Sequence, residues 1–373
     1  MATPRAHYRP ILVTKRGELA AVEELSNDAK ARMTPLFVAH PVEWNYETDS
    51  PARTAPEHVA GLGHKLAKAM GAGRAFFDPV FLTENTEWPY SEPHPLHTVI
   101  TDAAERQLRL VPVVGLGRHS SYTAAAAEIN RKTGEGACVR LSPQEWPTTP
   151  SNIQDLESLL TAIKVDPTNV DLILDLAEEV NSSLAVGLVS TTLSTLPHSS
   201  DWRSLTITAS SFPKDLSGIQ KGNITRIPRR DWKLWNSTVI YARNEGRRIP
   251  DFGDYAVSHP DPVVQADPRI LSISASLRYT ADADWLVAKG ELFKGRGGTG
   301  SGGDAAIHVA QMIADAPEYC GRDYSAGDLW IHQVATTASN GGNPERWRRT
   351  ATNHHLTFVT NSLANPGETS NEI

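Results

Sequence analysis

Two carboxylates interrupt apolar stretches of the sequence in which a charged side chain is unexpected. Asp175 lies within LILDLAEE, and Asp254 lies beside Tyr255 within FGDYAV. Burying a carboxylate is costly unless it is paired, bound to a metal or in contact with water, so Asp175, Asp254 and Tyr255 are candidate catalytic residues. Two structural interpretations stay open. Asp175 can pair with Arg140, and Gly253 can form a bulge or strand edge beside Asp254.

Other polar side chains follow apolar runs at positions where the strands of a parallel barrel would end. Functional groups of such barrels gather at these carboxyl ends, and we expect Lys15 and Arg140 to hold a phosphate group there. Each residue of this kind can equally be a solvated or loop-stabilising group. The remaining ones are Arg16, His40, Glu43, Asp78, Arg118, His119, Glu178, Ser210, Ser211 and Lys214.

Sequence motifs for metal binding and for nucleophilic catalysis are absent. HEXXH, HXH, paired Cys–His spacings and GxSxG do not occur, and neither cysteine carries a motif of a reactive thiol. The adjacent His354 and His355 point to different sides of any regular element and would not share one ion. We assign no metal ligand and leave any cofactor unidentified, with a metal site built from His40, Asp175 and Asp254 as the alternative.

The run GRGGTGSGGD, residues 295–304, precedes a predicted helix and raises the question of a phosphate cradle. It lacks the Lys of a GxxxxGK[ST] motif. Free backbone N–H groups with Lys294 and Arg296 could still bind an anion. Alternatively, the run is a flexible loop that ends at Asp304 as the helix N-cap.

The C-terminal third carries a denser set of basic and aromatic residues. One predicted helix presents Trp347, Arg348 and Arg349 together. This set can pack on the barrel, dock a protein partner, or bind a nucleotide or nucleic acid. The candidate binding residues of the region are Arg278, Tyr279, Lys289, Arg296, Trp347 and His354, and His355 is a further candidate catalytic residue.

A second basic and aromatic cluster is RIPRRDWKLWN, residues 226–236. Trp232 and Trp235 are three residues apart, so they share a helix face. We expect them to cover the outer wall of the barrel with the Arg side exposed. A nucleic-acid sensor would instead use 226–236 together with 346–349.

The elements that position these residues repeat one pattern over the first 262 residues. Short apolar runs alternate with segments of helical period. The runs are apolar at consecutive positions, which is typical of parallel strands covered on both faces. They lie at 9–15, 34–40, 74–81, 109–115, 137–142, 170–176, 204–210 and 250–258. Eight such units predict an α/β fold, a (β/α)8 TIM-like barrel, with a doubly wound open sheet as the competitor.

After residue 262 the pattern changes, and we expect a C-terminal α+β extension, residues 263–365, packed on the barrel. RILSISASLRYT and DWLVAKGEL are predicted strands, AAIHVAQMIADA is a predicted helix, and LWIHQVATT is predicted as another strand. NPERWRRTATNHHLTFVTNSLA is a predicted helix that opens with Pro. Residues 366–373 are expected to fray.

The bulk composition excludes several classes of protein. The 373 residues are 40% hydrophobic and 21% charged, as in soluble globular proteins, and no run approaches the length of a membrane span. The net charge of −7 argues against a general nucleic-acid coat. Two cysteines and no signal peptide predict a cytoplasmic protein.

Several short segments, in their order along the chain, resemble the Beta protein family, named after a protein of a satellite phage. They are YRPILVTKRGELAAVEEL with TPLFVAH, TASSFPKDL, RRDWKLW, FGDYAV, LRYT with WLVAKG, and GNPERWRRTATNHHLTFV. The resemblance covers about residues 8 to 363. In one departure, Val38 stands in PLFVAH where the pattern PLFEV has an acidic residue, so any chemistry of that residue is lost here or passes to Glu43.

The resemblance implies a protein of phages or mobile elements. The family's namesake restrains a toxic partner in an operon associated with antiphage defence. No enzymatic activity comes with the family, so no catalytic residue is carried over. Three hypotheses follow: a barrel protein that acts through a protein partner encoded nearby, an enzyme for a nucleotide or phosphorylated substrate at the barrel mouth, and a nucleic-acid sensor.

Overall fold

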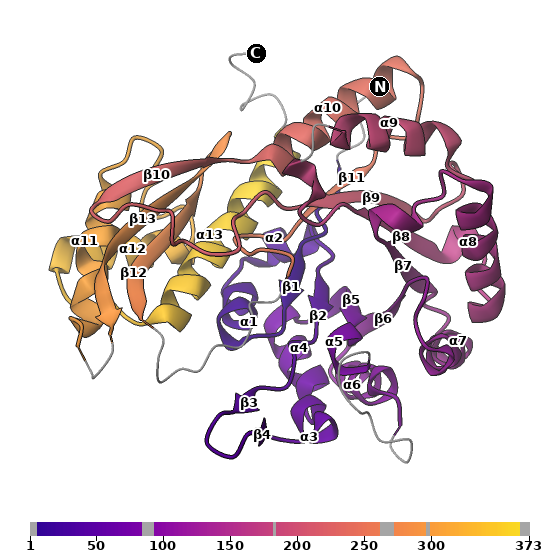
Figure 1. Ribbon diagram of the computed structural model, residues 1–373, viewed down its shortest axis with the longest axis horizontal. Coiled ribbons are helices and arrows are strands. Elements are labelled where there is room, and N and C mark those ends of the chain that lie inside the picture. Colours follow the sequence, from indigo (N-terminus) through magenta and orange to yellow (C-terminus); the bar gives the residue numbers. More distant parts are fainter. Residues whose placement is uncertain (1–5, 84–92, 182–183, 262–271, 296–298, 366–373) are drawn as a thin grey trace.

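The computed structural model describes residues 6–83, 93–181, 184–261, 272–295 and 299–365. Its larger part is a ring of eight parallel strands surrounded by helices, so the predicted (β/α)8 barrel is confirmed (Figure 1). Each predicted apolar run coincides with one of these strands to within one residue at its start or contains it. They are β1 (Ile11–Val13), β2 (Leu36–Val38), β5 (Gly73–Asp78), β6 (Leu108–Val114), β7 (Ala137–Leu141), β8 (Val170–Asp175), β9 (Ser204–Ala209) and β11 (Asp251–Asp254).

The ring closes between its first and last strands. Tyr8 and Phe252 form a parallel bridge. The Arg9 N–H donates to the Phe252 carbonyl over 2.9 Å, and the Phe252 N–H donates to the His7 carbonyl over 3.2 Å. These hydrogen bonds exclude the open-sheet alternative, because an open sheet leaves both edge strands unpaired.

The strands are apolar at consecutive positions because both of their faces are buried. Ile11 and Phe76 belong to the apolar cluster inside the ring. Their neighbours Leu12 and Phe77 point the other way and pack against the surrounding helices. Successive side chains of a strand alternate between its two faces, so a strand buried on both sides needs an unbroken apolar run.

The helices between the strands cover the outside of the ring. The segment after β1 forms two helices that are separated at Ser26, whose hydroxyl accepts from the Ala29 N–H. The barrel helices are α1 (Arg16–Glu23), α2 (Asn27–Ala31), α3 (Ala55–Val59), α4 (Leu62–Met70), α5 (Val80–Thr83), α6 (Pro95–Ala104), α7 (Ser120–Thr133), α8 (Pro150–Ile163), α9 (Ala185–Thr195) and α10 (Arg230–Asn244). A small hairpin, β3 (Trp44–Asn45) with β4 (Ser50–Pro51), follows β2.

The predicted Trp pair covers the outer wall of the barrel as expected. Trp232 and Trp235 stack with ring centroids 5.2 Å apart, and both lie edge-on to Phe252 of β11. The Trp235 indole N–H donates to the Pro250 carbonyl. The spacing of three residues predicted the shared helix face, but the expectation of an exposed Arg side does not hold for Arg229, which is 2% exposed.

The C-terminal extension is a three-stranded antiparallel sheet with three helices, at the left of Figure 1. The strands β12 (Ile273–Thr280) and β13 (Asp284–Lys294) were predicted, but the third strand, β10 (Asn223–Pro228), comes from the segment between β9 and α10 and was not. Its helices are α11 (Ala305–Ala314), α12 (Ala326–Thr337) and α13 (Pro344–Ala364).

The prediction of a strand at LWIHQVATT is wrong, because these residues form most of α12. Trp330, Ile331 and Val334 are buried, and their spacing of three and four residues is that of one helix face. The Ser325 hydroxyl accepts from the Asp328 N–H and starts the helix. A short apolar run fits a strand or a helix equally well, and the cap was the overlooked signal.

The long helix α13 lies between the barrel and the extension (Figure 1). It packs against α1 on one side and against β12 on the other. Its segment Thr352–His355 is fully buried. The Asn353 side chain donates to the Ala21 carbonyl of α1 and accepts from the Gly327 N–H of α12. This helix therefore fixes the position of the extension on the barrel.

The glycine-rich run is described only in part, and Arg296 lies outside the described residues. Asp304 directly precedes α11 as expected, but its side chain makes no capping hydrogen bond. Gly303 instead approaches the backbone of Gly341 and Gly342 so closely that a Cβ would lie 3.0 Å from the Gly342 oxygen. At this point the glycine permits close packing of two loops. No helix in the described part of the chain is long and apolar enough to span a membrane.

Candidate functional site at the barrel mouth

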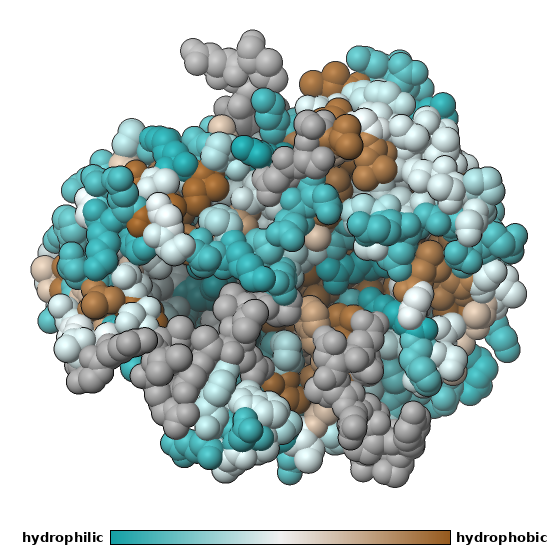
Figure 2. All heavy atoms as spheres, in the orientation of Figure 1, coloured by the Kyte–Doolittle hydropathy of each residue, from teal (hydrophilic) through white to brown (hydrophobic). Residues whose placement is uncertain are grey.

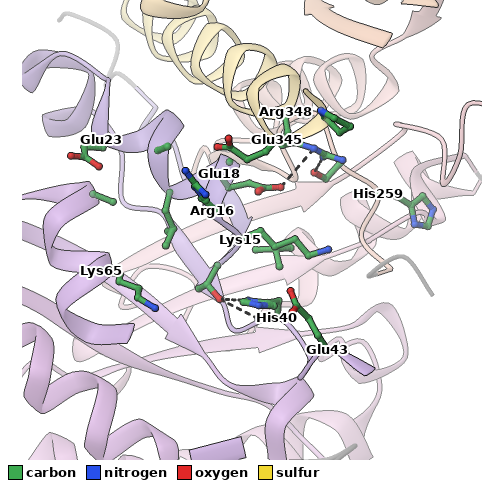
Figure 3. A pocket seen from close by; sticks show the side chains of 18 of the residues that line it. Lys15, Arg16, Glu18, Glu23, His40, Glu43, Lys65, His259, Glu345 and Arg348 are labelled. Carbon is green, nitrogen blue, oxygen red and sulfur yellow. Dashed lines mark hydrogen bonds and ion pairs between the residues drawn. The ribbon is translucent and has the colours of Figure 1, made fainter. Parts of the chain in front are cut away.

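A cleft of about 840 Å³ opens where the carboxyl ends of β1 and β2 face helix α13 (Figure 3). Thr14, Lys15 and Arg16 follow β1, and His40 and Glu43 follow β2. Glu345 and Arg348 enter from α13 on the opposite wall. Hydrophilic side chains surround the hollow between extension and barrel in Figure 2. The cleft is therefore built jointly by the barrel and the extension, at the end where barrel enzymes place their sites.

The cleft concentrates positive charge, although the whole chain carries a net charge of −7. Eight Lys or Arg side chains line it, against five carboxylates. Lys214 pairs with Asp261, and Lys68 pairs with Glu23 over 3.0 Å. No ion pair with any of the described residues is made by Lys15, Arg16, Arg53, Lys65 or Arg278. A concave surface with uncompensated cations raises the local concentration of anions.

At the junction of barrel and extension, the guanidinium groups of Arg278 and Arg348 line the cleft together. Arg348 lies 3.8 Å from the Glu18 carboxylate and donates to the Ser258 hydroxyl. Arg278 donates to the Val257 carbonyl over 2.6 Å and lies over the Phe212 ring. Burial, followed by repulsion from Arg348, lowers the pKa of Arg278 well below its usual value. This shift indicates a positive charge that the protein compensates incompletely.

His40 is a neutral imidazole on the cleft wall. Burial, followed by the neighbouring His58, Lys15 and Arg53, lowers the pKa of His40 to about 4. Its Nδ1 lies 3.1 Å from the Thr14 hydroxyl, and its ring meets His58 edge-on. At neutral pH His40 therefore adds no charge, and it offers the cleft a group that can accept or donate a proton.

On the other side of the same mouth, the predicted residues form a closed charge network. Arg118 donates to both oxygens of Asp78, over 2.7 and 3.0 Å. Arg140 donates to Asp175 over 2.9 Å and to the Tyr255 hydroxyl over 2.7 Å. Tyr255 in turn donates to Asp175. The pairing of Asp175 with Arg140 is thus present, and catalytic roles for Asp175 and Tyr255 stay predictions.

The pKa values in this network follow from the pairing. Burial alone would raise the pKa of Asp78, but Arg118, Arg140 and the Tyr122 hydroxyl lower it below its usual value. Burial and then the negative charge of Asp175 raise the pKa of Tyr255, although Arg140 opposes the shift. Asp78 is therefore ionised and the Tyr255 phenol keeps its proton at neutral pH.

Asp254 and His355 form a buried pair beneath the mouth. Asp254 accepts from the Tyr8 hydroxyl over 2.7 Å and lies 2.8 Å from the His355 Nε2. The other ring nitrogen of His355 lies 2.8 Å from the Thr280 hydroxyl. Asp254 is 1% exposed and His355 is 0% exposed. The pair joins β11 to α13, and its predicted catalytic role would require access that this arrangement does not offer.

His354 belongs to a second buried pair within the extension. Its Nδ1 lies 2.8 Å from Asp328, which also accepts from the Tyr279 hydroxyl over 2.8 Å. The rings of Tyr279 and His354 stack at 3.7 Å. The two neighbouring histidines thus point to different partners, as predicted. The binding roles predicted for Tyr279 and His354 remain predictions, because neither residue lines the cleft.

Two further predicted residues, Lys289 and Trp347, do not line the cleft. The Lys289 ammonium donates to the Leu216 and Ile219 carbonyls. Trp347 is 4% exposed, and its indole N–H donates to the Gly341 carbonyl. Of the roles considered for the helix with Trp347, packing against the rest of the protein is therefore the one that Trp347 has. The proposed metal ligands are not brought together, since His40, Asp175 and Asp254 each have the separate partners described above.

Of the predicted binding residues, Lys15 and Arg278 line the cleft, and so do four strand-end candidates, Arg16, His40, Glu43 and Lys214. Sequence reasoning named Arg348 only together with Trp347 and Arg349, and it did not assign Glu18, Arg53 or Lys65 to a site. Of these residues, Glu18 offered a sequence signal, because it is a carboxylate in the first turn of an amphipathic helix. In the structure its side chain is buried, with 5% of the residue exposed. The others lie on surface segments far apart in the chain, and only the packing of α13 on α1 brings them together.

The comparison with known proteins gives one family. The family described as Beta protein matches residues 8–361, which is nearly the whole chain. No curated protein matches the sequence.

Proposed function

The chain belongs to the Beta protein family, and we propose that it binds a small phosphate-bearing molecule in the cleft between the barrel mouth and α13. The observation that carries this proposal is the placement of Arg278 and Arg348 on one cleft wall, where Arg348 lies 3.8 Å from the Glu18 carboxylate and Arg278 makes no ion pair with the described residues. A bound anion would supply the missing negative charge.

The chemistry of the cleft favours phosphate over other anions. Guanidinium groups bind phosphate oxygens through two parallel N–H donors. The Lys15 ammonium makes no hydrogen bond to the described residues, and Lys65 and Arg53 line the same space. Several cations around one space match a group with two negative charges better than a single carboxylate. His40 stands beside Lys15 as the group that could move a proton if the bound molecule is also a substrate.

Calorimetric titration with inorganic phosphate and pyrophosphate tests the proposal. We expect pyrophosphate to bind, with an affinity that falls as salt is added. Arg348→Ala should weaken this binding by about 10-fold to 100-fold, because a charge-assisted contact is lost. Arg349→Ala is the matched control. It removes the same charge from the same helix, but Arg349 pairs with Glu24 and does not line the cleft.

The proposal fails if neither anion binds, or if both variants weaken binding equally. In the second case the attraction is a general effect of net charge and not a property of the cleft.

We further propose, as a second candidate function, that the protein docks a protein encoded by an adjacent gene, in the phage-defence setting that the family resemblance implies. The observation in its favour is an apolar surface on two neighbouring outer helices, α9 and α10. Val186 is 51% exposed and Ile240 is 53% exposed, with Leu184 beside α9 at 75%. Exposed apolar clusters of this kind are typical of protein interaction sites.

Co-expression with the adjacent genes tests this second candidate. The tagged protein should retain its partner, and the double variant Val186→Asp with Ile240→Asp should release it. Leu329→Asp is the control, because Leu329 is also an exposed apolar residue but lies on α12 in the extension. Isolation of the protein alone, with all neighbours expressed, would count against this candidate.

The nucleic-acid hypothesis receives less support from the geometry. Arg226 pairs with Glu318, and Arg229 is 2% exposed. Trp232, Trp235 and Trp347 are packed against other parts of the protein. Nucleic-acid binding requires accessible cations and aromatic faces, and the segments predicted for this role offer few of them.

A further inference from the structure

A second, smaller hollow adjoins the cleft on the extension side. It has a volume of about 180 Å³, and Arg278, Pro344 and Arg348 line both spaces. Its other lining residues are Ile273, Ser274, Ser276 and Trp347. The two guanidinium groups therefore stand between a charged compartment and a compartment that is otherwise uncharged. A ligand gripped by these groups would have a neutral portion on the far side of its phosphate.

The polar residues of this hollow form a stripe along β12. Ser274, Ser276 and Arg278 alternate with the buried Ala275 and Leu277, so they lie on one face of the strand. The pairing of β12 with β13 is irregular on both sides of Ser274. Bulges of this kind redirect side chains and are common next to binding sites. The irregular pairing thus occurs where the strand lines the hollow.

The hydroxyls of Ser274 and Ser276 make no hydrogen bond with the described residues. Each can donate one hydrogen bond and accept two. Ile273, Pro344 and Trp347 add apolar surface to the same small space. A sugar ring combines hydroxyl groups with an apolar C–H face, so it matches both kinds of surface. The volume is below the roughly 300 Å³ at which pockets for drug-sized ligands begin, which limits the occupant to a group of about one ring.

We propose that the ligand is a sugar phosphate, with its phosphate held by Arg278 and Arg348 and its sugar hydroxyls held by Ser274 and Ser276. This inference rests on the proposed phosphate site and adds the chemical class of the remaining part of the ligand. The same chemistry is present in a free pentose phosphate and in the ribose phosphate of a nucleotide.

Titration with three probes separates the parts of the proposal. Pyrophosphate reports the phosphate site alone, ribose 5-phosphate adds the sugar, and a nucleoside 5′-monophosphate adds a base. We expect ribose 5-phosphate or the nucleotide to bind at least about 10-fold more tightly than inorganic phosphate, because two neutral hydrogen bonds are gained. The tighter of the two identifies the source of the sugar phosphate.

The double variant Ser274→Ala with Ser276→Ala should remove this gain and leave pyrophosphate binding unchanged. Ser158→Ala with Ser194→Ala is the matched control, because both serines are exposed on the outer barrel helices α8 and α9. Equal affinity for inorganic phosphate and for both sugar phosphates would overturn the inference while the phosphate site stands. An unchanged gain in the double variant would also overturn it. Absence of all binding, pyrophosphate included, is the separate failure of the phosphate site itself.

Discussion

The two halves of the barrel mouth differ in how their charges are compensated. Around β5, β7, β8 and β11, Asp78 and Asp175 meet Arg118 and Arg140 within hydrogen-bond distance. Around β1 and β2, cations such as Lys15 face a cleft without a carboxylate partner. Both halves occupy strand ends of the same ring. Position at a strand end therefore does not distinguish a binding site from a structural network. Charged side chains that line a cleft without an ion-pair partner are the better indication of a binding site.

The paired half is expected to contribute to stability, and Asp78→Ala is its strongest test. Asp78 is 0% exposed and is the partner of Arg118 and Arg140. Its removal takes from Arg118 the carboxylate with which it pairs, while Arg140 keeps Asp175. We expect the free energy of unfolding to fall by about 3–5 kcal/mol. Denaturant unfolding measures the change. A loss below about 1 kcal/mol would mean that the network is solvated and is not a structural element.

At the amino end of the barrel, the ion pairs of Asp171 can be tested independently, through the dependence of stability on pH. Burial would raise the pKa of Asp171, but Arg74 and Arg203 lower it from 3.8 to about 2. Both guanidinium groups lie 2.7 Å from its carboxylate. Because the pKa of Asp171 is lower in the folded state, its ionisation stabilises the fold by about 2 kcal/mol above pH 3.8. This stabilisation is lost as the pH falls towards 2.

Unfolding of the wild type and of Asp171→Asn between pH 5 and pH 2 measures this contribution. The difference in stability between the two proteins should shrink by that amount as the pH falls. A difference that does not change with pH would show that Asp171 titrates normally.

The open half predicts the opposite response to the loss of a charge. Arg278→Met removes a half-buried cation that has no ion pair within the described part of the chain, and relieves its repulsion with Arg348. This gain offsets the lost hydrogen bond to Val257, so we expect stability to change by less than about 1 kcal/mol. Pyrophosphate binding should weaken strongly in the same variant. A stability loss as large as that of Asp78→Ala would erase the distinction between the two halves.

The smallest expected effect concerns the helix that lines the open half. A Cβ on Gly17 of α1 would lie 3.1 Å from the Glu345 carbonyl and 3.2 Å from Cγ of Arg348, whereas a Cβ on Gly187 of α9 meets nothing within 4 Å. Gly187→Ala should raise stability by about 0.5–1 kcal/mol, the usual gain inside a helix.

Gly17→Ala should lack this gain and should weaken pyrophosphate binding, because Arg348 is displaced. Thermal unfolding and titration of the two variants test the pair. Equal stabilisation with unchanged binding would mean that α1 and α13 are not held at this distance.

Much of the fold followed from local patterns. Six of the eight barrel strands lie within the predicted apolar runs, and β5 and β6 begin one residue earlier. A strand covered on both faces requires apolar residues at consecutive positions. The exceptions were also local. LWIHQVATT is too short to separate a strand from a helix by its apolar residues alone, and 223–228 was not recognised because its strand, β10, is largely exposed.

The sequence by itself determined which side chains reach the strand ends, since the end of each apolar run marks them. It could not determine which of these charges would meet. Asp175 met Arg140 because β7 and β8 are neighbours in the ring, and Asp254 met His355 because α13 packs beneath the mouth. Arg278 and Arg348 came to line one cleft through the docking of the extension. Electrostatic compensation depends on distances between residues far apart in the chain, and only the closed ring with its docked extension sets those distances.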